Sequence, residues 1–243
     1  MRTAMKIRRG LRGAVDPITA QYDAILATEP DIPLLYCLIE YRGQIVLFQD
    51  APCTVPVEDI GDPIGGQRHP ITGEILAVQT TDAERLIWLG EEIGAQLSES
   101  ATGTRNMVAD LGLTAPFTMA MRFLSTGGSG RRIDGRTSSN NIIWCENDDH
   151  AALWDGAWQN SDRPWIRDEL HTTAAWIDAN GDFRYYDSDL GWGQVFENFG
   201  TLQAGETTLY NHTTPGSGGN ALRGTIQHAL FWDQKTEDVE FQE

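Results

Sequence analysis

The segment FTMAMRF, residues 117–123, places large apolar side chains at its odd positions, with smaller or polar ones between them. This period of two is typical of a β-strand with one buried face, because successive side chains of a strand point to opposite sides. A second segment, GTIQHALFW at residues 224–232, alternates less strictly. The two segments indicate that strands build the core of this protein.

Short strand-like runs continue on both sides of these segments, separated by clusters of Gly, Pro, Asn and Asp. The sequence DANGD at residues 178–182 predicts a hairpin turn, because Asn-Gly tolerates the positive φ that such turns need. About ten strands without interleaved helices predict an all-β fold, a two-sheet antiparallel sandwich. The predicted strands are residues 34–41, 45–48, 75–79, 85–89, 117–124, 141–145, 151–154, 170–177, 183–186, 207–210 and 224–232.

One helix is predicted before the first strand. Asp16 and Pro17 suit the cap and first position of a helix. The apolar residues that follow share one helical face, and Pro30 ends the segment; these residues are Ile18, Tyr22, Ile25 and Leu26. Loops rich in Gly and Ser are predicted at residues 125–140 and 213–220.

The net charge of the 243-residue chain is −17 and is unevenly distributed. Residues 1–13 carry +5, so the remaining 230 residues carry −22, the difference between −17 and +5. Such an acidic body argues against nucleic-acid binding, which needs clustered positive charge. We interpret the basic arm as an assembly tether that docks on an acidic neighbour; its cations are Arg2, Lys6, Arg8, Arg9 and Arg12.

No segment has the length and hydropathy of a secretory signal or a membrane span, so no membrane insertion is expected. Cys37, Cys53 and Cys145 form no paired motif. We expect free thiols in a protein assembled in a reducing cytoplasm.

The end of the chain resembles the closing strand of laminin-G-like, concanavalin A-like domains. The resemblance lies in ALRGTIQHALFWD at residues 221–233 and the following QKTEDVE. Residues 170–178 and 181–186 are similar to the central hairpin of that family, and residues 117–123 to the strand that opens its sheet. The resemblance implies a jelly-roll sandwich over residues 36–243, preceded by an arm and short helix in residues 1–35.

A narrower resemblance concerns LFQDAPCTVPV, residues 47–57, which leads into GDPIG at residues 61–65. It is similar to a segment of tailed-bacteriophage structural proteins that carry such domains. This implies a virion protein, assembled in the host cytoplasm with other virion proteins and forming a homo-oligomer on the particle. We expect a tail or baseplate position with an outward-facing jelly roll; a capsid decoration protein without a ligand is the alternative.

Four tryptophans lie among polar residues, the setting in which an indole stacks on a sugar while neighbours bind its hydroxyls. Host-surface glycan binding is therefore predicted at Trp154, Trp158, Trp165 and Trp192, with Asp187 and Asp189. The alternative is a core or subunit interface, where Trp is also enriched. Trp88, Trp144, Trp176 and Trp232 lie within predicted strands and are assigned to the core.

Catalytic and metal sites find less support. Glu146 and Asp148 alternate as paired carboxylates of a glycosidase do, but the third acid is missing and the segment is typical of a solvated turn. No enzyme is therefore expected, and a glycan depolymerase is a third hypothesis. The metal content is undetermined by the sequence. Calcium is the ion this fold admits at loop rims; the candidate ligands are Asp148, Asp149, Asp178, Asp182, Asp187 and Asp189.

Overall fold

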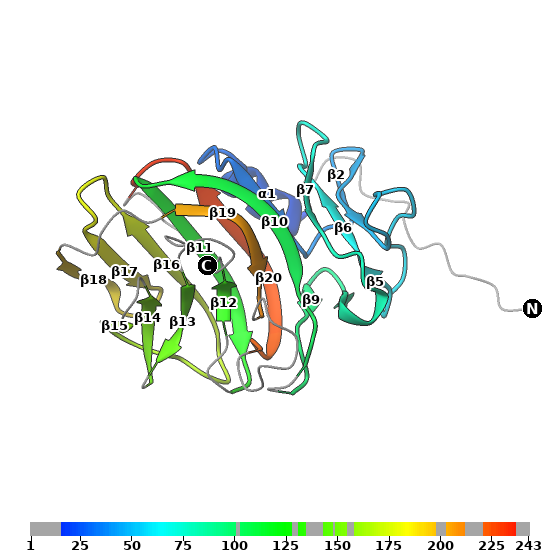
Figure 1. Cartoon of the computed structure of the whole chain (residues 1–243). Helices are drawn as coiled ribbons and strands as arrows, with labels where there is room; N and C mark the ends of the chain where they lie inside the picture. Colours follow the sequence, from blue (N-terminus) through cyan, green and yellow to red (C-terminus); the bar gives the residue numbers. More distant parts are fainter. Residues whose placement is uncertain are drawn as a thin grey trace, which may run out of the picture.

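The computed structural model describes residues 16–100, 103–127, 131–134, 143–147, 149–154, 158–197, 203–211 and 221–236 (Figure 1). The basic arm with Arg2, Lys6, Arg8, Arg9 and Arg12 lies outside these residues, so its role as a tether stays a prediction. The predicted loop at residues 213–220 also lies outside them. No helix among the described residues is long and apolar enough to cross a membrane.

Two antiparallel sheets, each of nine strands within the described residues, form a sandwich. The first sheet contains β18 (Gly191–Phe196), β17 (Phe183–Asp187), β16 (Leu170–Ile177), β11 (Phe117–Ser125), β20 (Gly224–Trp232), β9 (Ala95–Gln96), β8 (Leu86–Trp88) and β5 (Pro63–Ile64), with β1 (Ile32–Leu35) paired to β20.

The second sheet follows a similar path. It contains β15 (Trp158–Pro164), β14 (His150–Trp154), β13 (Ile143–Asn147), β12 (Arg131–Asp134), β19 (Gln203–Leu209), β10 (Met107–Thr114), β7 (Ile75–Val78), β6 (Gly66–Arg68) and β4 (Leu47–Phe48). A small ribbon pairs β2 (Glu40–Tyr41) with β3 (Gln44–Ile45), and a 3₁₀ turn spans Asp82–Glu84. Figure 1 places β5, β6 and β7 at one end of the molecule and β15, β17 and β18 at the other.

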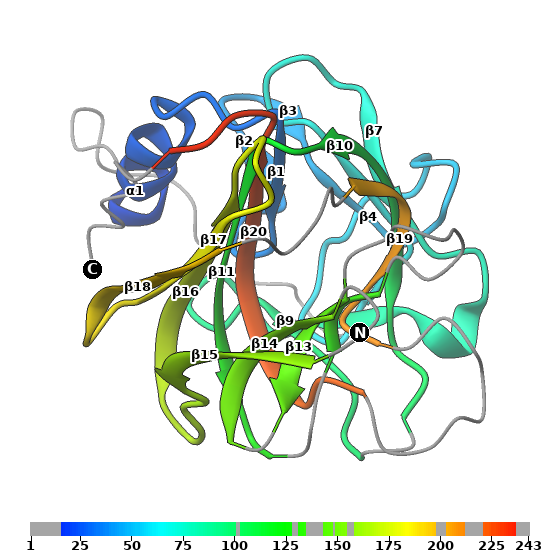
Figure 2. The ribbon, with the colours of Figure 1, turned by 60° about the vertical axis from the view of Figure 1, so that its left-hand side comes forward.

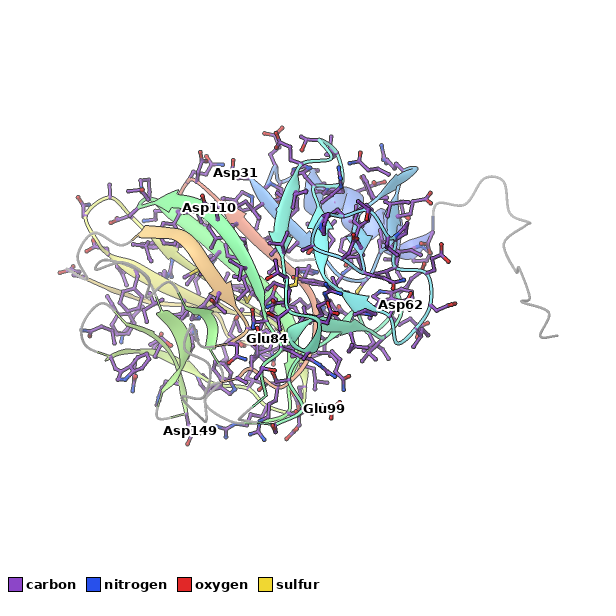
Figure 3. All side chains as sticks on the ribbon, turned by 45° about the vertical axis from the view of Figure 1, so that its right-hand side comes forward. Asp31, Asp62, Glu84, Glu99, Asp110 and Asp149 are labelled. Atoms are coloured by element: carbon purple, nitrogen blue, oxygen red, sulfur yellow. The ribbon has the colours of Figure 1, made fainter. Side chains whose placement is uncertain are left out.

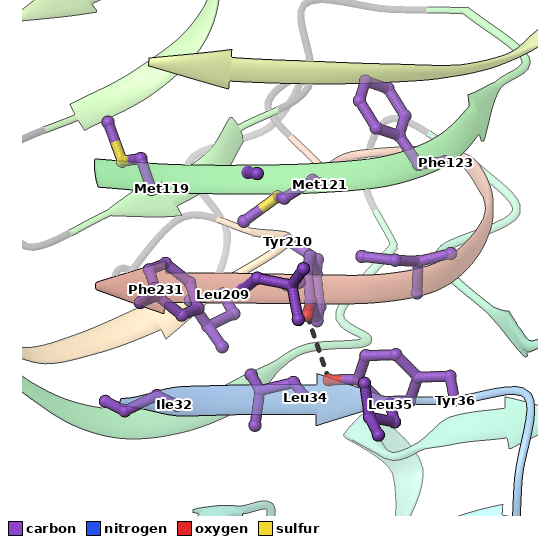
Figure 4. Close-up of a cluster of buried hydrophobic side chains, with 14 of the residues drawn as sticks. Ile32, Leu34, Leu35, Tyr36, Met119, Met121, Phe123, Leu209, Tyr210 and Phe231 are labelled. Carbon is purple, nitrogen blue, oxygen red and sulfur yellow. Dashed lines mark hydrogen bonds between the residues drawn. The ribbon is translucent and has the colours of Figure 1, made fainter. Parts of the chain in front are cut away.

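The core lies between the sheets. Figure 4 draws Met119, Met121 and Phe123 of β11 together with Leu209 of the second sheet, and all four belong to the hydrophobic core. All four side chains are buried, which accounts for the apolar odd positions of the segment. Beside them the hydroxyls of Tyr36 and of Tyr210, which follows β19, lie 3.0 Å apart. Burial raises the pKa of both phenols, so this buried pair stays neutral.

Two even positions of β11 are buried as well, contrary to a strand with one solvent face. Thr118 and Ala120 are fully covered, because helix α1 (Pro17–Leu26) and residues 233–236 lie over the outer face of the first sheet. Tyr22 of the helix donates from its hydroxyl to the carbonyl of Gln227 at 3.2 Å. Figure 2 shows the helix beside the sheet rather than between the sheets.

Residues 16–35 are therefore built into the sandwich. Tyr22, Ile25 and Leu26 are buried, which confirms the predicted apolar face of the helix. Strand β1, which ends at Leu35, pairs with β20 from Ile32 to Leu35. The boundary expected after residue 35 thus falls at the last residue of a strand of the main sheet.

Several strands differ from the predictions. β16 and β20 have the predicted bounds, whereas β10, β15 and β18 were not predicted at all. In β10 the pattern is interrupted by Gly112, whose φ of +59° coincides with a register shift against β19. The prediction of a loop throughout residues 125–140 was wrong, because β12 forms within this range.

The segment at residues 47–65 folds on itself. The Asp50 carboxylate accepts hydrogen bonds from the backbone N–H groups of Thr54 and Val55 at 2.8 and 2.9 Å. Gly65 and Gly66 lie directly against the backbone of residues 49–50, so close that a Cβ at either position would collide with it. Local packing thus explains Asp50 and Gly65, two of the residues on which the resemblance of this segment rests.

Two of the predicted free thiols are confirmed within the described residues, since Cys37 and Cys53 are buried and unpaired to each other. Burial raises the pKa of Cys37 to about 11, which keeps this thiol protonated and unreactive. The side chain of Cys145 lies outside the described residues.

Candidate functional site

Three half-buried side chains share the outer face of the first sheet at its β17–β18 end. Arg184 and Tyr186 alternate with buried residues along β17, so both point away from the second sheet. Trp192 of β18 stands directly opposite Tyr186, with ring centroids 5.3 Å apart. The guanidinium carbon of Arg184 lies 5.7 Å from the centroid of the Trp192 ring. This arrangement presents two aromatic rings and a cation together.

Strand β15 of the second sheet holds this group from the side. Arg163 donates to the carbonyl oxygens of Gly191 and Trp192 at 3.1 and 2.6 Å, and the Asp162 carboxylate accepts from the N–H of Gln194 at 3.2 Å. Arg184 donates to the carbonyl of Gly193. We call Asp162, Arg163, Arg184, Tyr186 and Trp192 the edge cluster. It joins the two sheets where the sandwich closes.

The edge cluster also determines how this edge of the sheet can be used. An unpaired strand edge invites pairing with another strand, and charged side chains are a common way to block it. Here Arg163 and Asp162 satisfy backbone groups of β18 that would otherwise face outward. Two guanidiniums and one carboxylate give the cluster a local positive charge on a chain of net charge −17. The edge is therefore suited to binding through side chains rather than by strand addition.

Of the predicted glycan-binding residues, Trp192 and Trp158 fit an exposed site. Trp192 belongs to the edge cluster, and Trp158 begins β15 with 36% of its surface exposed. Both lie on strands that the sequence did not predict. Trp154 pairs with Trp158 across the β14–β15 hairpin, but its side chain lies outside the described residues.

Two predicted residues require correction. Trp165 is only 6% exposed and packs on Phe123, with ring centroids 6.0 Å apart, so it belongs to the core. Asp187 is 1% exposed and its carboxylate accepts the backbone N–H of Asp189 at 2.9 Å. Neither side chain reaches a ligand at the surface. Asp189 itself is exposed in the β17–β18 turn.

The carboxylate and calcium candidates form no common site in the described part of the chain, where no group of three metal-ligating side chains occurs. Asp149 is exposed and pairs with Arg167 at 3.0 Å. The Asp178 carboxylate accepts the N–H groups of Asn180 and Asp182, which confirms the hairpin turn. Asp148 and the side chain of Glu146 lie outside the described residues, so a calcium site stays a prediction.

The sequence reasoning missed Asp162, Arg163, Arg184 and Tyr186. The alternation of FRYYD at residues 183–187 was a usable signal, since it places Arg184 and Tyr186 on one face. No local sequence pattern predicts the contact between β15 and β18. The residues in contact lie about 30 positions apart in the sequence, and the two strands approach each other closely at Gly193. Of the four tryptophans assigned to the core, Trp88, Trp144 and Trp232 belong to it, whereas Trp176 is buried on the outer face of the first sheet.

Comparison with known proteins gives a fold. No protein-family model matches the chain, and no curated protein matches it. Among solved structures, domain 4 of AbnA, a GH43 extracellular arabinanase from Geobacillus stearothermophilus in complex with arabinotriose, has a TM-score of 0.51 at 16% identity, over 79% of this chain and 92% of that one. This chain is an all-β jelly-roll sandwich. That identity is too low to show more than the fold.

Two further structures are more distant. The CBM40 of Ruminococcus gnavus IT-sialidase bound to α2,3-sialyllactose has a TM-score of 0.44 and 11% identity, over 60% of this chain and 92% of that one. Trypanosoma rangeli sialidase has a TM-score of 0.48 and 10% identity, over 90% of this chain and 36% of that one. None of the three structures bears on a phage origin.

Proposed function

We propose that this chain is a glycan-binding module and that the edge cluster is its sugar-binding site. The observation that carries the proposal is the grouping of Trp192, Tyr186 and Arg184 on one sheet face, half-exposed and within 6 Å of one another as rings and cation. Aromatic rings stack on the C–H faces of sugars, and a guanidinium donates hydrogen bonds to their hydroxyls.

The site is held in place before any ligand arrives. Trp192 and Tyr186 lie on paired strands, and Arg163 binds the backbone on both sides of Trp192. Sites built on strands lose little conformational freedom on binding, which favours affinity. The AbnA domain, crystallised with arabinotriose, supports the proposal by analogy of fold only.

The setting that we propose is the virion of a tailed phage, with the jelly roll facing outward to adsorb on host-surface glycan. The resemblance of residues 47–65 supports it. Many weak sites on one particle would then act together, and avidity can exceed single-site affinity by about 100-fold or more. Other virion proteins and further copies of this chain would be its partners.

The binding test uses the full chain on an array of neutral and acidic oligosaccharides. We expect Trp192→Ala to reduce binding to the best array ligand about five- to thirtyfold, because stacking on one aromatic ring contributes on the order of 1–2 kcal/mol. Leu190→Ala is the matched control, an exposed residue of the same hairpin outside the edge cluster. Binding that survives Trp192→Ala, or no binding to any sugar, would overturn the proposal.

A further measurement tests the position of the chain on the virion. Locating the chain in a cryo-EM map of the particle distinguishes a tail or baseplate protein from the alternative, a capsid decoration protein spread across the lattice.

Repeating the glycan-array measurement in the presence of EDTA tests whether binding needs calcium. Release of reducing ends from host polysaccharide would reveal a depolymerase, which is not part of this proposal; Glu146→Gln would then be the first variant.

A further inference from the structure

Trp176 lies beneath a segment from the end of the chain. Its ring belongs to the outer face of the first sheet, opposite Thr118 of β11 and Arg184 of β17. The ammonium nitrogen of Lys235 lies 3.4 Å from the centroid of this ring, and Trp176 is only 1% exposed. The face that a ligand would stack on is therefore occupied by a side chain of the same molecule.

The indole N–H of Trp176 is buried, yet it has no hydrogen-bond partner among the described residues. Buried indole N–H groups usually find an acceptor, because leaving one without a partner costs free energy. An acceptor supplied by a ligand would satisfy this N–H group. A sugar hydroxyl is an acceptor of suitable size and chemistry.

The covering segment is residues 233–236, which we call the strap, and its Asp233 N–H donates to the Asp31 carboxylate at 2.7 Å. The Thr118 hydroxyl donates to the carbonyl of Gln234 at 2.8 Å and accepts the N–H of Thr236 at 2.9 Å. Lys235 also lies 3.9 Å from the Asp178 carboxylate, a long ion pair with an exposed cation. Residues 233–236 lie outside the strands, so this segment can leave the sheet without disturbing the strands beneath it.

Trp176 lies beside the edge cluster on the same face of the first sheet. Arg184 stands directly opposite Trp176 on the neighbouring strand and also lies against the ring of Trp192. Trp176 and Trp192 are two strands apart on one face, a lateral separation of about 10 Å. This is within the length of a short oligosaccharide. A chain of sugars lying on Trp192 would therefore extend across Arg184 toward the strap.

We propose that Trp176 is a second sugar-stacking subsite, closed by the strap, which takes the distal unit of a linear neutral oligosaccharide. The inference rests on the proposed function of the edge cluster. A sugar ring would replace the Lys235 ammonium on the indole face, and one of its hydroxyls would accept from the indole N–H. Because the strap must move first, short sugars bind to the edge cluster alone, and longer ones compete with Lys235.

The test measures binding of linear neutral oligosaccharides of two to six sugar units to the full chain by calorimetry. Lys235→Ala removes the competitor and should tighten binding of the longer sugars by about three- to tenfold, with no change for the disaccharide. Lys235→Arg is the matched control, because a guanidinium stacks on the same ring and keeps the site closed.

The outcomes separate this inference from the proposed function. If the longer sugars bind through Trp192 but Lys235→Ala brings no gain, the subsite is overturned and the edge-cluster site stands. If Lys235→Ala binds them and Trp176→Phe cancels the gain, while Trp192→Ala changes nothing, the subsite stands and the edge-cluster site fails. If no variant binds any of the sugars, both are overturned.

Discussion

Gly193 is the residue at which the two sheets come closest at the β15–β18 edge. A Cβ at this position would collide with the carboxylate of Asp162, which accepts the N–H of Gln194. We predict that Gly193→Ala displaces this carboxylate and lowers the free energy of unfolding by about 1–2 kcal/mol, the range for a lost hydrogen bond with local strain. Urea denaturation of both proteins measures the difference.

A double-mutant cycle isolates the cause. In an Asp162→Ala background the collision is absent, so adding Gly193→Ala should cost much less than it does in the wild type. An equal cost in both backgrounds would show that Asp162 is not what excludes a side chain at position 193.

His228 makes the stability of the protein depend on pH. It lies under helix α1, with its ring 6.2 Å from that of Tyr22 and opposite Arg122 in the sheet register. Burial, with a smaller contribution from the Arg122 cation, lowers the pKa of His228 to about 3. In the unfolded chain this pKa is near 6.5. Between pH 6.5 and 3 the imidazole is therefore protonated in the unfolded chain but not in the folded one.

The sign follows from that difference. This contribution to stability is present above pH 6.5 and is lost as the pH falls toward 3, by up to about 1.4 kcal/mol per pH unit. We predict that His228→Gln, although less stable at pH 7, shows a shallower loss of stability between pH 6.5 and 4 than the wild type. Urea midpoints across this range measure both slopes; parallel curves would exclude His228 as the cause.

At the scale of single residues, the predicted strands identified four buried tryptophans. Trp88, Trp144 and Trp232 belong to the hydrophobic core, and Trp176 is buried on the outer face of the first sheet. Trp165 has polar neighbours in the sequence but packs on Phe123 of another strand. Its burial depends on a partner 42 positions away, and local composition carries no information about such a partner.

At the scale of elements, the β4–β6 region is fixed by backbone contacts that admit only glycine. A Cβ on Gly66 would collide with Cys53 Sγ and lie 2.7 Å from the carbonyl oxygen of Asp50. We predict that Gly66→Ala destabilises the protein by about 2–4 kcal/mol, since backbone must move to make room. Thermal unfolding measures the change.

Val55→Ala in the same segment is the control for Gly66→Ala. Val55 is exposed, and substitutions at exposed sites usually change stability by less than about 0.5 kcal/mol. If Gly66→Ala were equally mild, the packing of this segment would not explain its sequence, and a role in contact with another protein would become the better explanation.

The sequence predicted long strands better than short ones. β11, β16 and β20 have clear apolar patterns because both of their faces are covered or nearly so. β15, with the sequence WQNSDRP, has no such pattern, because it is an edge strand whose side chains bind another strand or face solvent. Its existence follows from pairing with β14, a tertiary event that composition does not record.

At the scale of the whole molecule, the sandwich class followed from the count of strands and the absence of interleaved helices. The way residues 16–35 join the sandwich did not. The helix is locally encoded, but its place follows from Tyr22, which bonds the carbonyl of Gln227 and the N–H of Cys37. These bonds join the beginning of the described chain to its last strand and to the segment after β1.

Charge is the remaining property of the whole molecule, and it leads to a prediction about salt. Figure 3 shows labelled carboxylates at opposite ends of the molecule, among them Asp31, Asp62, Glu99 and Asp149. With a net charge of −17 at pH 7, repulsion among such groups destabilises the compact state, and salt screens it.

We predict that raising NaCl from 20 to 300 mM at pH 7 increases the melting temperature by about 2–5 °C. Near pH 4.5, the isoelectric point of the sequence, the net charge vanishes and the increase should vanish with it. Scanning calorimetry at the two pH values and two salt concentrations measures the melting temperature under all four conditions. A melting temperature that falls with salt at pH 7 would mean that ion pairs such as Arg42–Asp23 and Arg85–Asp82, which salt also screens, outweigh the repulsion.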